Sequence, residues 1–585
     1  MNTKGIALVA TLALMVVIAL LVFGTFFTTQ IELWTTRNDT TSVQAFYAAE
    51  AGLQKYKAVL FQQYVWREQR GQGGGGPGCF TPLVTGLDLD RNGTLIPFTN
   101  NQLVLAEDEA VMDAFGNPVG RYRVVLYKDA QDGQLFTLVS QGTSSGAKAT
   151  VQATFRISNT GYLEQAIFAG TGQANKWLNG GATIRGGIYV VGSPSDPNQT
   201  VIEANGNFAL YNWYDLNAYS GIASRVEPGY QKVQDLCASL RVQYGKISVG
   251  GSTEIGEPTN KVKGVFVGRG AQDIVGRGAQ DITRENVDVC GNNKGVCTET
   301  LGGFDLSNPP PFPTLDAKLD SDACSAYPTW RNCLQNRAAL RIQRLENQVP
   351  IATPLDVNLD PSCLQALQSG TLTLDNKDVD CTFTRPDGSR GGFRYTYTGN
   401  NKSGQGLLQV FGDVVLEGLN LVLNQPTDYQ ASSSSGSAKS ATFAVLAKDG
   451  AGGNLDINGS LLPDASFGSF PGHALGLVVE KNLYQRGQYV MAPVYAGGTF
   501  RVVKNYVLFG SVIANEFCTT SAGGQNTGNQ GGNKNNKNEE KEDQCNAGQK
   551  AEVVYIRIPK ENRPVLLPDL KGGKPVFQVL SYERR

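Results

Sequence analysis

The sequence predicts an α+β protein in which a long N-terminal helix and an antiparallel sheet are joined to a large parallel β-solenoid. Three observations support this fold class. The run from Gly5 to Ile31 has no charged residue, residues 103–157 alternate apolar with polar side chains, and the chain beyond Tyr162 has short Val, Ile, Phe and Leu runs interrupted by Gly and Asn. Glycine supplies 69 of 585 residues, which fits a chain with many turns.

Composition excludes several classes of function. Lys plus Arg (51) nearly cancels Asp plus Glu (52), so any affinity for nucleic acid must come from a local patch. The one histidine, His473, rules out a multi-histidine metal site within one chain, and a Ser-His-Asp hydrolase would depend on that single imidazole. The chain also has no GxxxxGK[ST] motif for a nucleotide-hydrolysing site. We therefore expect a non-enzymatic protein without a cofactor.

The N-terminal segment predicts one continuous helix over residues 6–68. Its apolar run from Ile6 to Phe27 is long enough to cross a bilayer, which takes about 20 residues. From residue 28 to residue 68 the chain has no proline and one glycine, Gly52, and its apolar residues recur at intervals of three and four. We expect residues 6–27 to be the transmembrane half and the amphipathic outer half to lie against a soluble head.

The leader ending in Lys4-Gly5, the apolar run that begins at Ile6 and the stretch AFYAAEAGL at 45–53 resemble the PilX-type minor pilins of type IV pilus systems. The resemblance implies that residues 1–5 are a prepilin leader, that a prepilin peptidase cuts after Gly5 and that the amine of Ile6 is methylated. It also implies a single-pass inner-membrane protein with its head in the periplasm, which later joins other minor pilins and the major pilin through its helix. The alternative is a plain single-span anchor, which the apolar run fits equally well.

Two positions depart from the usual pilin pattern, since Ile6 replaces the first mature Phe and Ala10 replaces the Glu at the fifth mature position. In pilins that carboxylate pairs with the N-terminal amine of a neighbouring subunit, and an unpaired charge inside the membrane costs about 3 kcal/mol or more. A subunit with no neighbour above it has no partner for the carboxylate. Ala10 therefore suits a pilus tip at the cell surface; the alternative is drift in a minor subunit.

After the helix, residues 79–160 predict a four-stranded antiparallel head, with strands at 103–111, 119–127, 135–141 and 147–157 separated by Gly-rich turns. We expect residues 161–520 to form the β-solenoid, with a helical, disulfide-closed excursion at 316–347. A large β-sandwich is the alternative to the solenoid.

Residues 521–549 are low in complexity and predict a disordered, exposed loop. Strands are expected again over 550–585, where VFQVLSY is similar to the chain end of PilX-type proteins. The last strand would then return to the pilin sheet, with the solenoid inserted in the head. Such an insertion resembles the competence minor pilins of naturally transformable thermophilic bacteria.

Ten cysteines and no CxxC pair favour disulfides and an oxidising compartment over zinc. Connectivity does not follow from sequence. Pairing cysteines that are close along the chain gives Cys290 with Cys297, Cys324 with Cys333, Cys363 with Cys381, Cys518 with Cys545, and Cys79 with Cys237.

The octapeptide VGRGAQDI occurs twice in tandem, at 267–274 and 275–282. A dinucleotide-binding turn is rejected because aspartate occupies the third glycine position and no βαβ unit surrounds the repeat. Arg269, Arg277 and Arg284 would line one side of a groove and meet successive phosphates. The alternative is an expanded surface loop.

Two further basic segments are candidates for binding DNA. In the first, Arg331, Arg337, Arg341 and Arg344 have no acid among them, and the last three have helical spacing that predicts one face, with Trp330 and Tyr327 beside it to stack a base. The second interleaves cations with tyrosines, namely Lys481, Tyr484, Arg486, Arg501 and Lys504. For both, the alternative is an ordinary solvated surface.

One weak metal candidate is the Asp-x-Asp-x-Asn-Gly stretch formed by Asp88, Asp90 and Asn92. It matches the first half of a calcium loop, but Thr99 stands where the bidentate Glu belongs. An Asn-Gly hairpin turn is the alternative.

The function implied by the resemblance is that of a minor pilin at the tip of a type IV pilus or DNA-uptake machine, whose solenoid binds extracellular double-stranded DNA for natural transformation. Two alternatives remain, a tip adhesin that binds surface glycans and a membrane-tethered β-helix glycoside hydrolase. Strong salt dependence of binding would separate DNA from glycan.

Overall fold

The computed structural model divides into two compact units, which are described one at a time. The first contains Met1–Trp66, Pro82–Ile157 and Phe577–Arg585, and the second contains Arg67–Thr81 and Ser158–Val576. The structure describes residues 3–70, 96–129, 135–158, 161–171, 182–204, 208–249, 252–269, 273–276, 295–299, 301–304, 310–319, 321, 323–344, 350–354, 359–385, 387–400, 404–434, 436, 438–503, 506–520, 551–559, 562–568 and 576–584.

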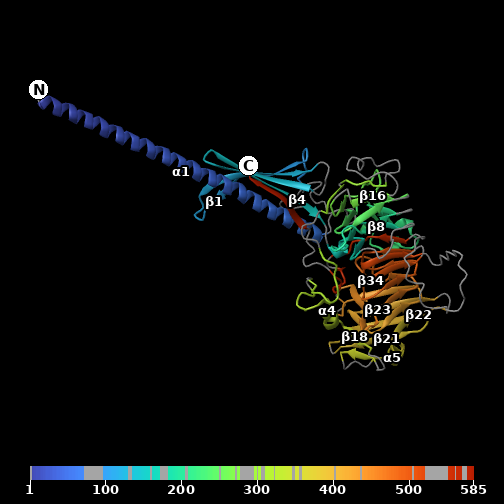
Figure 1. Ribbon diagram of the computed structural model, residues 1–585. Helices are drawn as coiled ribbons and strands as arrows, with labels where there is room; N and C mark the ends of the chain where they lie inside the picture. Colours follow the sequence, from blue (N-terminus) through green and yellow to red (C-terminus); the bar gives the residue numbers. More distant parts are fainter. Residues whose placement is uncertain are drawn as a thin grey trace. The chain divides into compact units, whose positions relative to one another are not determined.

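The first unit is a long helix with a five-stranded sheet, ordered β1-β2-β3-β4-β38 (Figure 1). Neighbouring strands from β1 to β4 are antiparallel. The last strand of the chain completes the sheet, and Gln152 Nε2 of β4 donates to Glu583 of β38 at 2.8 Å. The second unit is therefore an insertion between two adjacent strands of the head. The elements are α1 (Thr3–Arg70), β1 (Gln102–Met112), β2 (Pro118–Lys128), β3 (Leu135–Ser144), β4 (Ala147–Ser158) and β38 (Val576–Arg584).

Small side chains let α1 lie close against this sheet. Ala45, Ala48 and Ala49 are buried, and they belong to the stretch that resembles pilins. On the sheet side, a Cβ at Gly142 would lie 2.0 Å from the Ala45 carbonyl oxygen and 2.4 Å from the Ala49 nitrogen. This packing explains the small residues of the AFYAAEAGL stretch, because bulkier residues on this helix face would hold the helix off the sheet.

The part of α1 before the sheet has no partner in the structure. Every side chain from Ala10 to Thr40 is exposed, and α1 contains a segment with a mean hydropathy of 2.6 that is long and apolar enough to cross a membrane. The long N-terminal helix predicted from the sequence is confirmed.

The second unit is a solenoid of parallel strands. Its first sheet contains β18 (Leu340–Gln343), β24 (Val414–Glu417), β27 (Ser440–Lys448), β31 (Ala474–Val479), β34 (Val494–Val503), β36 (Val512–Thr520), β5 (Ile167–Ala169), β7 (Ile188–Val190), β12 (Ser239–Val242), β15 (Gly264–Val267) and β17 (Leu301–Gly302). The second contains β20 (Thr371–Leu374), β25 (Asn420–Leu423), β29 (Leu455–Ile457), β32 (Leu483–Gln485) and the later residues of β34 and β36.

A third parallel sheet completes most rungs. It contains β23 (Gln405–Phe411), β26 (Thr427–Ser432), β30 (Leu461–Pro463), β33 (Tyr489–Met491), β35 (Tyr506–Phe509), β37 (Ala551–Val554), β6 (Thr183–Arg185), β9 (Ala209–Tyr211) and β14 (Glu254–Ile255), extended by antiparallel β21 (Val379–Thr384) and β22 (Arg390–Thr398). Smaller pieces are β8 (Thr200–Ala204), β13 (Lys246–Val249), β16 (Ile274–Gly276), β10 (Tyr214–Asp215), β11 (Lys232–Val233), β19 (Ile351–Thr353), β28 (Ala451–Gly452), α4 (Trp330–Arg337), α5 (Pro361–Leu367) and the short turn η1 (Tyr162–Glu164).

Identical faces of successive rungs stack to form the core. Val512, Ile167, Ile188, Leu240 and Val265 are aligned on five neighbouring strands and all are buried. Corners between the sheets carry stacked asparagines, since Asn454 Nδ2 donates to Asn420 at 3.1 Å and Asn458 Nδ2 to Asn424 at 2.8 Å. This explains the Gly and Asn interruptions, because amide side chains hydrogen-bond from rung to rung where the backbone turns.

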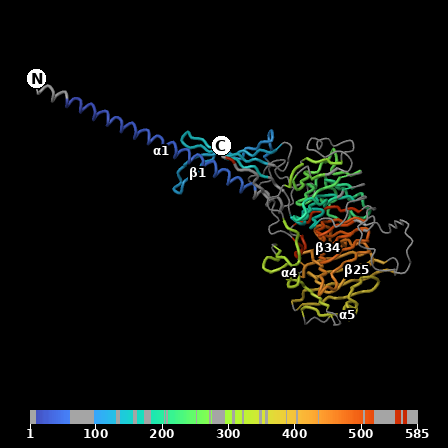
Figure 2. The backbone as a smooth tube through the Cα atoms, in the orientation of Figure 1, coloured from blue at the N-terminus to red at the C-terminus, as the bar shows by residue number. Residues whose placement is uncertain are grey.

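The rungs do not follow the order of the chain. Strand β5, the first, lies between β7 and β36, the last strand of the same sheet. The chain enters in the middle of the stack, builds toward β17, restarts at β18 and builds back until β36 meets β5. Within the solenoid the colours accordingly run from green through red and orange to yellow (Figures 1 and 2). Both ends of the insertion thus lie on adjacent rungs.

Candidate nucleic-acid interface

Two of the predicted DNA-binding arginines are neutralised within the wall of the solenoid. Arg331 of α4 makes two 2.8 Å bonds to the Glu480 carboxylate and a 3.0 Å bond to Asp316. Arg341 of β18 bonds to Glu417 at 2.7 Å, and the Glu417 side chain is 1% exposed. A guanidinium held by a buried carboxylate has little net charge to offer a phosphate.

The prediction that Trp330 stacks a base is wrong. Its side chain is fully buried, its Nε1–H donates to the Leu566 carbonyl at 2.9 Å, and it meets the Tyr495 ring edge-on with centroids 4.6 Å apart. The indole fastens α4 to the outside of the first sheet. Packing against the outer face of this sheet removes the large indole from water.

The prediction that Arg337, Arg341 and Arg344 share one helical face is also wrong. The helix α4 ends at Arg337, where Ala338 leaves the helical conformation. Arg341 lies on β18 and Arg344 follows that strand. Although the arginines have helical spacing, this segment forms a strand that pairs in parallel with β24. The strand is favoured because it buries Leu340 and Ile342 in the core.

The tandem repeat offers one described arginine. Arg269 pairs with Asp273 at 2.9 Å and its side chain is 59% exposed, and it also donates to Asn198 at 3.1 Å. The second copy begins in β16. Arg277 and Arg284 lie outside the described residues.

The segment after residue 480 is arranged around Tyr484 on β32. The Arg501 guanidinium is 5.4 Å from the centre of the Tyr484 ring and that of Arg486 is 6.0 Å away. Arg501 is buried and Arg486 is exposed, so only the second presents its charge to solvent. Lys504 lies outside the described residues.

Three cationic residues from distant parts of the sequence lie at the corner between the first and second sheets. Arg344, Lys448 and Lys481 follow strands β18, β27 and β31 or end them. A Cβ at Gly418 would lie 2.5 Å from the Arg344 carbonyl oxygen and 3.3 Å from the Lys448 Cβ. Lys481 Nζ donates to the Gly450 carbonyl at 2.6 Å, two residues beyond Lys448. We call these three residues the basic corner.

The basic corner has the chemistry of a phosphate-binding row. Within the described part of the chain, its three side chains make no ion pair with an acid. Arg344 and Lys448 lie two rungs apart, with the corner at Gly418 between them, and Lys481 lies on the rung after Lys448. Rungs repeat about every 4.8 Å, so the three cations span about 14 Å, a length over which a nucleic-acid strand presents several phosphates. Tyr484 and Arg486 continue the row on the second sheet, directly after Lys481. Sequence reasoning missed Lys448, whose only indication is its place at the end of the third strand, β27, of a stack that the sequence does not order.

A comparison with solved structures decides the family. The chain is 72% identical to the competence-associated pilin ComZ from Thermus thermophilus, over 93% of this chain and 97% of that chain, with a TM-score of 0.72. This chain belongs to the ComZ family of competence-associated pilins. No family model and no curated protein matches it.

Membership in the ComZ family confirms the resemblance that the N-terminal residues indicated and assigns α1 its role. The exposed apolar half of α1 anchors a pilin in the membrane before assembly, and the chain is a minor pilin of DNA uptake. Gly5 and Ile6 lie in α1, and their side chains are outside the described part of the structure. The calcium candidate Asp88, Asp90 and Asn92 lies wholly outside it. Among the described residues no group of three or more His, Cys, Asp or Glu could hold a metal ion.

Disulfides of this ComZ-family pilin include two of the expected pairs, Cys324–Cys333 and Cys363–Cys381. Three more cysteines are in disulfides whose other halves lie outside the described residues, namely Cys237, Cys297 and Cys518. The expected partners Cys79, Cys290 and Cys545 also lie outside them, so those three pairs stay predictions.

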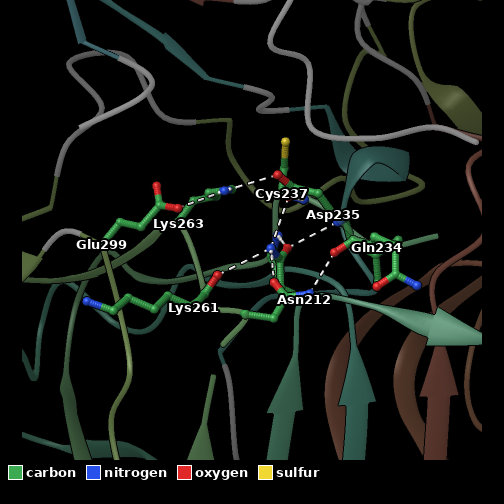
Figure 3. Close-up of polar contacts among 10 residues, drawn as sticks. Asn212, Gln234, Asp235, Cys237, Lys261, Lys263 and Glu299 are labelled. Atoms are coloured by element: carbon green, nitrogen blue, oxygen red, sulfur yellow. Dashed lines mark hydrogen bonds and ion pairs between the residues drawn. The ribbon is translucent and has the colours of Figure 1, made fainter. Parts of the chain in front are cut away.

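The backbone around Cys237 is held by one buried amide (Figure 3). Asn212 Oδ1 accepts from the Leu236 and Ala238 nitrogens at 3.1 and 2.8 Å, and its Nδ2 donates to Asp235 at 3.0 Å. Cys237 itself has a φ of 55°, a strained value for a residue with a side chain. The network fixes this conformation, and the sulfur points away from it (Figure 3).

Proposed function

We propose that this ComZ-family protein is the tip subunit of its pilus and that its solenoid binds extracellular double-stranded DNA at the basic corner. The observation that carries the proposal is the convergence of Arg344, Lys448 and Lys481, which are distant in sequence and make no ion pair with a described acid. Three of the other candidate arginines, Arg269, Arg331 and Arg341, are engaged with carboxylates. The relative's association with competence supports DNA as the ligand.

The tip position is supported by the N-terminal sequence. Ala10 provides no carboxylate for the amine of a subunit above it. We infer cleavage after Gly5 by a prepilin peptidase and methylation of Ile6, followed by movement from the inner membrane, with the head in the periplasm, into the pilus. Mass spectrometry of the protein from pili tests this, and an intact Met1 would contradict it.

DNA binding is tested with the full-length chain in detergent. The variant R344A/K448A/K481A is compared with unmodified protein by fluorescence anisotropy of labelled duplex DNA over a salt series. Each lost phosphate contact lowers the salt slope by about one, so the triple variant lowers it by about three and weakens binding equally for all sequences.

The matched control removes three cations from the head, R121A/R123A/K148A. These side chains are exposed, and the control keeps the salt slope of the unmodified protein. Equal slopes in both variants would reject the basic corner. Salt-insensitive binding to surface glycans would favour the adhesin alternative. Turnover of polysaccharide would favour the glycoside hydrolase.

A further inference from the structure

The turn between β1 and β2 in the pilin head presents two large apolar side chains to solvent. Phe115 is 90% exposed and Met112 is 57% exposed. Beyond the N-terminal half of α1, Phe115 is the most exposed large apolar side chain among the described residues. Because burial of a phenylalanine is favourable by roughly 1.5–3 kcal/mol, an exposed one at a turn contributes nothing to the fold.

This turn is rigid. Asp113 Oδ1 accepts from the nitrogens of Phe115 and Asn117, each at 2.8 Å, and Asp113 Oδ2 accepts from Asn117 Nδ2 at 3.2 Å. The Asp113 and Asn117 backbones are also joined at 2.9 Å, and Gly116 takes the left-handed conformation, with a φ of 83°. A turn whose backbone is already fixed loses little conformational entropy when it binds a partner.

The turn lies at the end of the head from which the exposed half of α1 emerges. Ser144 Oγ lies 3.0 Å from both Gln44 Oε1 of α1 and the Val119 carbonyl oxygen, and its one proton is donated to either acceptor. Val119 is the second residue of β2. Ala45 begins the buried part of α1. At the same level, Val43 and Tyr47 leave 48% and 64% of their surfaces exposed.

We propose that Phe115 and Met112 form a docking knob for the head of the neighbouring pilin on the membrane side. The inference rests on assembly into a pilus, which the proposed function includes. When helices pack side by side in a filament, the next head lies at the end of this head where α1 emerges. A tip subunit has a neighbour on that side only, and at that end of the head α1 also exposes the apolar side chains Val43 and Tyr47.

The bilayer is a poorer partner for this knob. Between Phe27 and Gln44 the helix has about 25 Å of length at 1.5 Å per residue. That segment carries Glu32, Arg37 and Asp39, which hold it in water. The turn therefore stands well away from the apolar run.

Photo-crosslinking in piliated cells tests the knob in the full-length protein. A benzophenone amino acid replaces Phe115 in one strain, Leu21 on α1 in a second and Ile351 on the solenoid in a third. Leu21 and Ile351 are 65% and 42% exposed. We expect the probe at 115 to crosslink to head peptides of another pilin, identified by mass spectrometry, and the probe at 351 to give no pilin product.

The outcomes distinguish a failure of the docking-knob proposal from a failure of the proposed assembly into a pilus. If the probe at 21 captures a pilin and the probe at 115 captures none, or captures lipid or a protein that is not a pilin, the knob is overturned and assembly stands. If neither probe captures a pilin, assembly itself fails.

Substitutions at position 115 test the docking knob independently, through the amount of the chain that enters pili. F115D lowers the amount of the chain in sheared pili, relative to the membrane pool, by about tenfold, as expected for loss of a central apolar anchor. F115L keeps most of the anchor and restores incorporation, and I351D leaves incorporation unchanged. Equal incorporation of F115D and the unmodified chain would overturn the proposal.

Discussion

Among the described ion pairs, those of the pilin head are exposed, whereas the inserted solenoid also contains buried ones. In the head, Arg121 and Asp108 pair with 53% and 64% of their side chains exposed. In the solenoid, Arg563 and Glu164 pair with 6% and 7% exposed. Exposed pairs contribute about 0–1 kcal/mol, whereas breaking a buried pair costs about 3–5 kcal/mol. The head is therefore held by the packing of α1 on its sheet, and the solenoid depends on its internal charges as well.

The buried pair joins the two ends of the insertion. Glu164 lies in η1, where the chain enters the solenoid, and Arg563 lies in the segment after β37, where it leaves. Tyr555 Oη also donates to Glu164, at 3.3 Å. Burial by itself would raise the pKa of Glu164, but the Arg563 and Arg557 guanidiniums outweigh it and hold the pKa below its usual value. This cluster joins the segments that begin and end the solenoid, which are far apart in the sequence.

The largest effect is expected from E164Q, which leaves the Arg563 guanidinium buried without its carboxylate. The solenoid should lose about 3–5 kcal/mol of unfolding free energy, measured by chemical denaturation. The matched control E107Q, in an exposed head pair, should lose less than about 1 kcal/mol. Because the folded pKa of Glu164 is lowered, its contribution is present above the usual Glu pKa and is lost as pH falls through the folded value. Equal losses in E164Q and E107Q would remove the contrast between the units.

The next largest effect is expected in the head from G142A. The added Cβ would lie 2.0 Å from the Ala45 carbonyl oxygen, so α1 must move away from the sheet, at a cost near the upper end of about 1–3 kcal/mol. Thermal unfolding of the head is the measurement. The control G229A adds a Cβ that meets nothing within 4 Å and should change little. A head that unfolds at the same temperature in G142A would show that the helix is not held by close packing.

A smaller, pH-dependent effect belongs to the solenoid alone, because it contains the one histidine of the chain. His473 is fully buried, its Nε2 accepts from the Ala431 nitrogen at 2.8 Å, and its Nδ1 faces the Gly468 carbonyl at 3.3 Å. Burial lowers its pKa to about 4. The neutral imidazole is thus the folded form, and its Nδ1 carries the proton.

Stability from this group is complete above the unfolded histidine pKa of about 6.5 and is lost as pH falls toward the folded value. Between pH 7 and pH 5 the solenoid should lose about 2 kcal/mol, as followed by denaturant titration at each pH. H473Q should be less stable at pH 7 but lack this decline. A solenoid in which H473Q and the unmodified chain show the same pH dependence would contradict the assignment.

The smallest effect is expected from R121A, which removes an exposed ion pair in the head. Its cost should stay below about 1 kcal/mol and shrink further in high salt. A loss as large as that of E164Q would mean that exposure does not govern the energy of these pairs. Denaturation at two salt concentrations measures both quantities.

The pilin part of the molecule was predictable because its evidence is local. The uncharged run, the continuous helical periodicity and the small residues of AFYAAEAGL are contiguous in sequence. The alternating strands of the head and the similarity of the last strand to other pilins led to the expected insertion, which the pairing of β38 with β4 confirms. Each of these features follows from short-range spacing of side chains.

The DNA-binding candidates were harder to predict, because charge in a sequence does not show which acid a cation meets. Arg331 and Glu480 are far apart along the chain, as are Arg341 and Glu417. Their pairing appears only when strands from separate segments stack. The helical face proposed for Arg337, Arg341 and Arg344 failed for the same reason, since burial of Leu340 and Ile342 between neighbouring strands outweighed a local spacing.

The residue patterns alone indicate a membrane-length apolar helix, a small antiparallel head and a β domain whose apolar runs are interrupted by Gly and Asn. Only the tertiary structure decided the order of the rungs, with β5 between β7 and β36, and therefore which cations are neutralised and which meet at the basic corner. The physical reason is that solenoid rungs bind through backbone hydrogen bonds and stacked apolar residues. Those interactions are alike in every rung, so the residue pattern of one rung does not predict which other rung lies beside it.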